Sequence, residues 1–350
     1  MQQNEPQQSQ KSFKYSIICQ NPIPQRNRWQ ICMAINESNS IFLFSEELTI
    51  RVFQFNNKMG LKHIQLLNNN RTSALSFFPK QQDQFVTGSK YSSILIWSKQ
   101  LISKAKFIQK LSGHIKGVSC IIFNVQNTLI VSGGEDSQIK FWTPFKSNKE
   151  EQIRNISDQQ WHCQQTIKDF NTTIATLSIN EQGNKLISCS TNQNILVIQK
   201  SSTTQMWVVI QKIKTEMWGR QLQFLNDKNF VFLPYDGKQL YLYRLNSVNN
   251  YTRKANFLVS MGSQYYGINP FYFKDRNILI LQGTLFLSCF RIKGNKKQSF
   301  KKKENFEIEK ELQIDLQHGF LKAILSLDGQ YLISLHQNQS EIQVRQFQEI

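Results

Sequence analysis

The chain has 350 residues, 40% of them hydrophobic and 12% aromatic, which is enough to bury a large core. Lys and Arg number 42 against 24 Asp and Glu, so the formal net charge is +18. No apolar run approaches the roughly 18 residues of a membrane-spanning helix, and the polar N-terminus argues against a signal peptide. The six scattered cysteines form no CxxC pair, which favours reduced thiols over disulfides or a zinc site.

The N-terminal segment divides into a tail and a strand. Residues 1–11 (MQQNEPQQSQK) are polar and rich in Gln, which predicts a disordered tail. Residues 13–19 (FKYSIIC) alternate like a β-strand, and a frayed N-terminal arm is the alternative interpretation.

Two units of similar rhythm follow, at residues 28–67 and 72–111. Each contains three short apolar runs separated by polar turns, and then a fourth run that predicts an outer strand. The third run of the second unit ends in Trp97, and Thr87 lies in its second run.

The next unit, at 117–167, contains the most informative segment. Residues 111–142 read LSGHIKGVSCIIFNVQNTLIVSGGEDSQIKFW. A Gly-His pair precedes a first strand, an acidic turn separates the second strand from the third, and the third strand ends in Trp142. This segment resembles one WD40 repeat, the unit of a β-propeller blade.

The resemblance implies a buried hydrogen-bonded relay of His114, Asp136, Ser132 and Trp142. These groups have complementary donors and acceptors, so the relay leaves no polar group unpaired. A Ser-His-Asp triad for acyl transfer is the functional alternative. The order of the residues, their loop context and the terminal Trp fit the structural relay, and nothing marks an oxyanion hole.

The same rhythm continues to the C-terminus, in units at 172–213, 219–259, 266–314 and 319–347, with starts about 44 to 55 residues apart. We therefore predict an all-β, seven-bladed WD40-type β-propeller with four antiparallel strands per blade, forming one domain over 12–350. The last unit lacks an outer strand, so residues 13–19 are expected to supply it and close the ring. Because several units are degenerate, six or eight blades remain alternatives.

A basic run lies between the third and fourth strands of the sixth unit. It contains Lys293, Lys296, Lys297, Lys301, Lys302 and Lys303. It fits a solvated loop, a contact for an acidic partner or a nucleic-acid backbone, or a nuclear localisation signal.

The resemblance also implies a top face, formed by the loops between blades and by the turns between second and third strands. Aromatic and charged residues there are candidate partner contacts. They are Lys90, Tyr91, Lys116, Glu135, Trp218, Arg220, Tyr235, Tyr265, Tyr266 and His318. Ordinary surface or inter-blade packing is the alternative for each residue.

No enzyme motif is present: the sequence has no GxxxxGK[ST], no HExxH and no GxSxG. We expect a non-catalytic scaffold without metal or cofactor that binds protein or peptide partners in the cytoplasm, with the nucleus as an alternative. A basic propeller that binds nucleic acid or a ribonucleoprotein is the second hypothesis. A propeller enzyme with its site in the central channel is the third, although no cluster of carboxylates or histidines suggests one.

Overall fold

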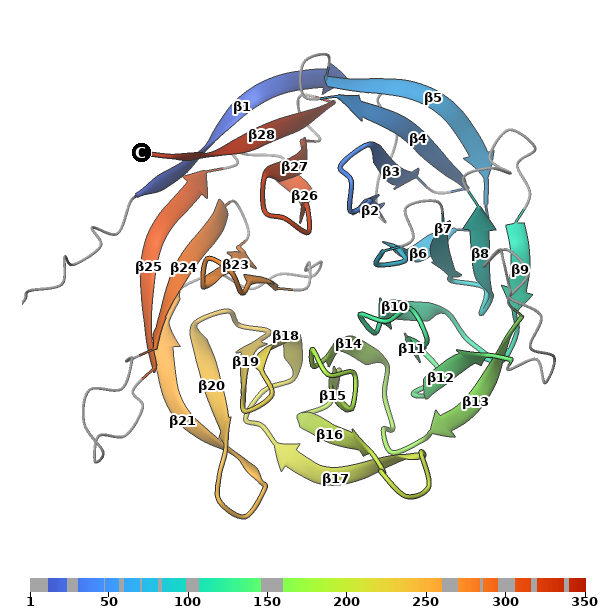
Figure 1. Ribbon diagram of the computed structural model, residues 1–350, viewed down its shortest axis with the longest axis vertical. Coiled ribbons are helices and arrows are strands. Elements are labelled where there is room, and N and C mark those ends of the chain that lie inside the picture. Colours follow the sequence, from blue (N-terminus) through green and yellow to red (C-terminus); the bar gives the residue numbers. More distant parts are fainter. Residues whose placement is uncertain are drawn as a thin grey trace, which may run out of the picture.

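Seven four-stranded antiparallel sheets form a closed ring in the computed structural model of the chain (Figure 1). The structure describes residues 12–23, 31–46, 48–56, 60–69, 71–80, 84–98, 107–145, 160–259, 270–283, 286–294, 306–315, 320–336 and 340–350. Among them, no helix has the length and apolar character that crossing a membrane would require. The predicted all-β propeller of seven blades is confirmed, and the alternatives of six and eight blades are excluded.

Each blade runs from an inner strand to an outer one. Blade 1 consists of β2 (Ile31–Ile35), β3 (Ile41–Glu46), β4 (Thr49–Asn56) and β5 (Gly60–Asn68), and blade 2 of β6 (Thr72–Phe77), β7 (Gln84–Ser89), β8 (Ile94–Ser98) and β9 (Phe107–Leu111). Blade 3 consists of β10 (Val118–Phe123), β11 (Ile130–Gly134), β12 (Ile139–Pro144) and β13 (Trp161–Ile167), and blade 4 of β14 (Ile174–Ile179), β15 (Lys185–Ser190), β16 (Asn194–Lys200) and β17 (Trp207–Lys214). Blade 5 consists of β18 (Gly219–Asn226), β19 (Asn229–Pro234), β20 (Gln239–Leu245) and β21 (Tyr251–Leu258), and blade 6 of β22 (Phe271–Phe273), β23 (Ile278–Gln282), β24 (Phe286–Gly294) and β25 (Phe306–Asp315). Blade 7 consists of β26 (Phe320–Leu325), β27 (Tyr331–His336), β28 (Glu341–Glu349) and β1 (Phe13–Pro22).

The burial of the strands follows from their place in the blade. Every residue of β3, β7 and β19 is buried, because the second strand of a blade is covered on both faces by neighbouring blades. The outer strand β17 instead alternates between buried or half-buried and exposed residues, since only one of its faces meets the core. The sequence pattern therefore changes from continuous apolar runs inside to alternation at the rim.

The core consists of seven apolar clusters, each of which lies between two adjacent blades. The cluster between blades 3 and 4, for example, joins Phe141 to Trp207, whose rings stack with centroids 4.9 Å apart. A blade has no core of its own, so its stability depends on its two neighbours.

The N-terminal strand closes the ring. β1 pairs antiparallel with β28, from Phe13 opposite Glu349 to Pro22 opposite Glu341, and blade 7 has the order β1-β28-β27-β26. The two ends of the chain thus lie side by side in one sheet (Figure 1). The rings of Phe13 and Phe347 stack across this pair at 5.2 Å, and the Tyr15 hydroxyl donates to the carbonyl of Gly329 at 2.9 Å. The strand extends three residues beyond the predicted 13–19.

The inner strand of blade 1 is β2, described from Ile31, and that of blade 6 is β22, which begins at Phe271. Residues 24–30 and 260–269 lie outside the described part of the chain.

A β-bulge recurs at the same place in all seven blades, where the outer strand pairs with the third strand. It marks the position that Trp142 occupies in blade 3. The residues at this position around the ring are Phe53, Trp97, Trp142, Ile198, Tyr243, Phe290 and Arg345.

Glutamine side chains bridge the outer strands of neighbouring blades. The Gln109 amide donates to the carbonyl of Trp161 at 2.7 Å and accepts from its N–H at 2.8 Å. Gln165 bridges to Trp207, and Gln211 to Tyr251, through the same two hydrogen bonds. Because each bridge fixes both backbone groups of one residue, it sets the register between adjacent blades.

Ring closure gives a first prediction. Deleting residues 1–20 removes most of β1, so the backbone groups of β28 face water and the sheet gains an open edge. We expect a lower melting temperature and visible aggregation on heating, measured by calorimetry and light scattering. The control deletion of residues 1–10 removes no described residue and leaves both nearly unchanged. Equal behaviour of the two truncations would contradict the assignment of β1 as the closing strand.

Candidate functional site

The candidate top face lies at one end of the ring. In blades 2 to 5, the turn after the second strand meets the loop before the first strand of the same blade at this end. The N–H of Glu135 donates to the carbonyl of Gly117 at 2.7 Å, and the N–H of Tyr235 donates to that of Trp218 at 3.0 Å. These residues flank the hairpins β10–β11 and β18–β19, whose first strands lie on the inner side of the ring (Figure 1).

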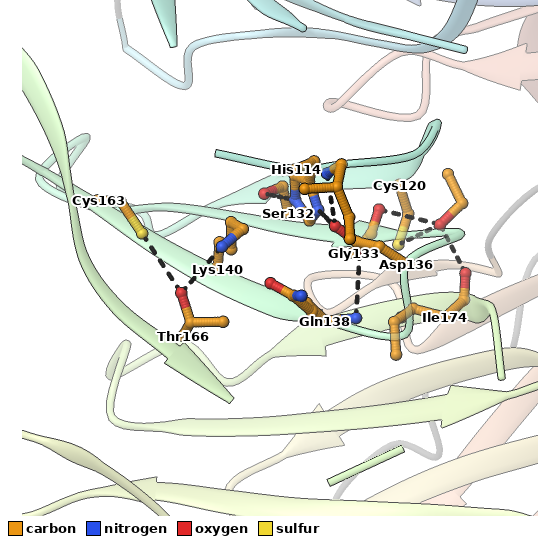
Figure 2. A network of polar contacts seen from close by, with 12 residues as sticks. His114, Cys120, Ser132, Gly133, Asp136, Gln138, Lys140, Cys163, Thr166 and Ile174 are labelled. Carbon is orange, nitrogen blue, oxygen red and sulfur yellow. Dashed lines mark hydrogen bonds and ion pairs between the residues drawn. The ribbon is translucent and has the colours of Figure 1, made fainter. Parts of the chain in front are cut away.

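The four relay residues of blade 3 are joined by hydrogen bonds into one relay. Figure 2 shows three of them: His114, Ser132 and Asp136. The Trp142 indole N–H donates to the Ser132 hydroxyl at 2.9 Å, and Ser132 Oγ lies 2.8 Å from His114 Nε2. His114 Nδ1 lies 2.9 and 3.0 Å from the two carboxylate oxygens of Asp136. The loop before β10, the strands β11 and β12 and the turn between them each supply one part.

The relay is complete with a neutral imidazole. Burial lowers the pKa of His114, and Lys140 lowers it further, while Asp136 acts in the opposite direction. Neutral His114 donates from Nδ1 to the carboxylate and accepts from Ser132 at Nε2, which leaves the Ser132 oxygen to accept from Trp142. The side-chain donors and acceptors that link the four relay residues are thereby all paired.

This arrangement holds the fold and offers no access for a substrate. The side chains of His114 and Asp136 are 0% exposed, and Ser132 is also 0% exposed. The hydroxyl that a Ser-His-Asp triad would use as nucleophile is engaged with both Trp142 and His114. The geometry thus supports the structural interpretation of these residues.

The relay also fixes a loop of the top face. Asp136 accepts from the backbone N–H of Ile115 at 3.0 Å and from that of Gln138 at 3.2 Å. Ile115 is 75% exposed and stands next to Lys116. The buried carboxylate therefore holds the backbone of the loop that carries this exposed apolar side chain.

Other blades retain parts of the relay. In blade 2, the Trp97 indole donates to the Thr87 hydroxyl at 3.0 Å, and Tyr91 stands in the turn where Asp136 stands in blade 3. In blade 7, Arg345 takes the place of Trp142 and donates to the Ser334 hydroxyl at 2.7 Å. Sequence reasoning missed Arg345, because only the strand register shows that a guanidinium replaces an indole.

The candidate top-face residues have different surroundings. Lys90, Tyr91, Lys116 and Glu135 are exposed. Trp218 and Tyr235 are half-buried and stack on one another, with centroids 4.0 Å apart and an angle of 17° between the rings. Tyr265, Tyr266, His318 and the side chain of Arg220 lie outside the described part of the structure.

The prediction that the basic run lies in a loop is wrong for its first residue, Lys293. Lys293 was expected in a loop, but it lies within β24, and its ammonium group is 2.6 Å from Glu309 on the adjacent strand β25. Cross-strand pairing with an acidic partner extends the strand beyond the point where its charge suggested an end. Lys296, Lys297, Lys301, Lys302 and Lys303 lie outside the described residues.

The described residues hold no cluster of three or more His, Cys, Asp or Glu that could bind a metal ion. All six cysteines are free thiols, and burial raises the pKa of Cys120 and of Cys289 to about 12. Such thiols stay protonated near neutral pH and are poor nucleophiles and metal ligands.

Comparisons with known proteins agree with this fold. Residues 105–143 match the family model described as WD domain, G-beta repeat. Pre-mRNA-processing factor 19 of Bos taurus is 24% identical over 120 residues, which are 34% of this chain and 20% of the relative. A WD repeat-containing protein WDS homolog of Arabidopsis thaliana is 34% identical over 64 residues, which are 18% of this chain and 12% of the relative.

A chain in a crystal structure of the mitotic checkpoint complex has the same fold, with a TM-score of 0.68 at 11% identity. The superposition covers 94% of this chain and 93% of that one. The fold is thus a seven-bladed β-propeller, and residues 105–143 within it match a WD repeat. The chain matches only about a fifth of the length of its pre-mRNA-processing factor 19 relative.

The relay gives a second prediction. Replacing Asp136 with Ala leaves His114 Nδ1–H and the Ile115 and Gln138 N–H groups without their acceptor. We expect the free energy of unfolding to fall by about 2–4 kcal/mol in denaturant titrations. Asp236→Ala is the matched control, because Asp236 stands at the equivalent position of the blade 5 turn and accepts from the N–H of Lys238. Similar losses in the two variants would contradict the relay's role.

A third prediction concerns pH. The folded pKa of His114 lies below its ordinary value of 6.5, so the unfolded chain binds the proton more tightly. Stability from this group is fully present above about pH 6.5 and is lost as pH falls through the lower, folded pKa. Urea titrations at about pH 7.5 and about pH 5.5 measure this loss, which shrinks in the His114→Gln variant. An equal pH dependence in both proteins would show that His114 does not cause it.

Proposed function

We propose that this protein is a non-catalytic scaffold that binds a protein or peptide partner on its top face, with Trp218 and Tyr235 as the anchor. The observation that carries the proposal is the aromatic stack at the end of the inner hairpin of blade 5. Large rigid rings at a surface give most of an interface's energy, because they desolvate a large area at small entropic cost.

Neighbouring loops of the top face add apolar contacts. Tyr91 is 60% exposed and Ile115 is 75% exposed. Their backbone N–H groups donate, each at 3.0 Å, to the Ser89 hydroxyl and to the Asp136 carboxylate. Preorganised loops lose little conformational freedom on binding, which favours recognition by this face. The relay of blade 3 would then serve binding indirectly, by fixing the loop that carries Ile115.

The comparisons support an assembly role in general terms. One relative is named for pre-mRNA processing, and one propeller of the same fold was solved in the mitotic checkpoint complex. Residence in the cytoplasm or the nucleus would suit a scaffold of either kind, and we propose no individual partner.

The anchor gives a fourth prediction. The Trp218→Ala variant is expected to lose the proteins that the wild-type chain captures from a cell extract, as identified by mass spectrometry. For a purified partner, we expect the affinity to fall about 30-fold, which corresponds to about 2 kcal/mol. Val248→Ala is the control, because Val248 is 69% exposed in the loop between β20 and β21, at the opposite end of the ring.

A salt titration separates the two hypotheses about the partner. Binding to a protein anchored on aromatic rings persists at moderate salt. Binding to nucleic acid falls steeply with salt, through counterion release, and is lost when Lys296, Lys297, Lys301, Lys302 and Lys303 are neutralised. Tight RNA or DNA binding with that behaviour, unaffected by Trp218→Ala, would overturn the scaffold proposal.

A further inference from the structure

Three aromatic and two acidic residues lie in adjoining segments at the top of blade 5. Trp218 and Glu216 lie in the loop before β18, while Tyr235 and Asp236 lie in the turn between β19 and β20. Tyr241 follows on β20 and stacks on the core residue Phe232, with centroids 6.2 Å apart. We call Trp218, Tyr235, Tyr241, Glu216 and Asp236 the blade 5 cluster.

The chain already binds one of its own cations at the edge of this cluster. The guanidinium carbon of Arg253 lies 4.7 Å from the centre of the Tyr241 ring, and Arg253 Nη1 lies 3.2 Å from Glu216 Oε1. An aromatic face and a carboxylate together therefore hold a cation at this surface. Tyr235 and Asp236, which are consecutive residues of the turn before β20, supply the same two kinds of group.

The electrostatics of the cluster favour positive charge. The Glu216 side chain is 73% exposed, and Asp236 holds its turn by accepting from Lys238 N–H at 3.2 Å. Burial raises the pKa of Tyr241, and the charges of Glu216 and Asp236 raise it further, while Arg253 opposes them. Two carboxylates thus act on one ring from different loops, in a chain whose net charge is +18.

The equivalent positions in blades 2, 3 and 4 lack this combination. The backbone hydrogen bond that joins Trp218 to Tyr235 joins Arg71 to Lys90 in blade 2, Gly117 to Glu135 in blade 3 and Thr173 to Thr191 in blade 4. None of those three pairs is aromatic. Among these four blades, only blade 5 places two stacked rings at this pair of positions.

We propose that the blade 5 cluster binds a lysine or arginine side chain of the partner protein, an inference that rests on the proposed scaffold function. The partner's cation lies against the Trp218 and Tyr235 rings and pairs with the carboxylate of Glu216 or Asp236. Arg253 combines an aromatic ring and a carboxylate in the same way, with Tyr241 and Glu216. The carboxylates repel phosphate groups, so this chemistry favours a basic peptide over a nucleic acid.

The test uses random peptides displayed on phage and selected on the immobilised full-length chain. Selected peptides are made with each Lys or Arg replaced by norleucine, and their affinities are measured by fluorescence polarisation. We expect one such replacement to weaken binding about tenfold, as does the double variant E216Q/D236N of the protein. Asparagine at 236 keeps the acceptor for Lys238 N–H, so the turn is preserved.

Two protein controls accompany these measurements. Asp169→Asn removes an acid in the loop between β13 and β14, where Asp169 pairs with Lys212 at 2.8 Å, and is expected to leave binding unchanged. Trp218→Ala is expected to abolish binding, and a thermal melt confirms that each variant is folded.

The outcomes separate the inference from the proposed function. Peptides that need Trp218 but tolerate norleucine would overturn the cation site and leave the scaffold proposal standing. Failure of every selected peptide to depend on Trp218 would overturn both. A single-stranded RNA oligonucleotide that binds the wild type and loses binding in Trp218→Ala would show base stacking at these rings, which also overturns the cation site.

Discussion

The whole structure depends on the burial of both faces of every blade by its neighbours. Each of the seven apolar clusters joins two adjacent sheets, and the cluster between blades 7 and 1 combines residues such as Phe44 and Val344 from nearly opposite ends of the sequence. Such a core exists only when the ring is closed. The pairing of β1 with β28 is therefore a requirement for the remaining blades as much as for blade 7.

Apolar contact alone does not fix the angle between two blades, and directional hydrogen bonds add that constraint. Ser73 Oγ donates to Val118 O, and Ser119 Oγ donates to Ile174 O, each at 2.6 Å, from one inner strand to the next. Glutamine bridges join the outer strands across the same junctions. Between blades 4 and 5, Ala175 occupies the position of this serine, and its side chain has no hydrogen-bond donor. The bridge from Gln211 to Tyr251 is still present at this junction. Blade 3 is thus joined to both of its neighbours by an inner serine bond and an outer glutamine bridge.

The sequence predicted the ring, the closing strand and most outer strands, because these follow from periodic apolar runs and one strong repeat. A further signal was available: Asn36, Asn124 and Asn180 each accept from two backbone N–H groups of the turn between first and second strands. What the sequence hides depends on register. The strand register of blade 7 is needed to see that the Arg345 guanidinium takes the place of an indole beside Ser334. The pairing of β18 with β19 is needed to see that Trp218 stacks on Tyr235, 17 residues further along the chain. The sequence likewise predicts a loop at Lys293, because its ion pair with Glu309 on the adjacent strand depends on the strand pairing.

A nearly symmetric ring repeats its backbone seven times, so selective binding must come from the places where the repeats differ. In blade 3, Gly117 lies against Glu135, and a Cβ at Gly117 would come within 3.0 Å of the Glu135 carboxylate carbon. In blade 5, the same pair of positions holds two stacked rings. The scaffold tolerates either solution, because the backbone bond between the two positions is the same and the core lies below it. Freedom at this pair of positions, above a constrained core, is what lets one blade acquire a recognition surface without loss of the ring.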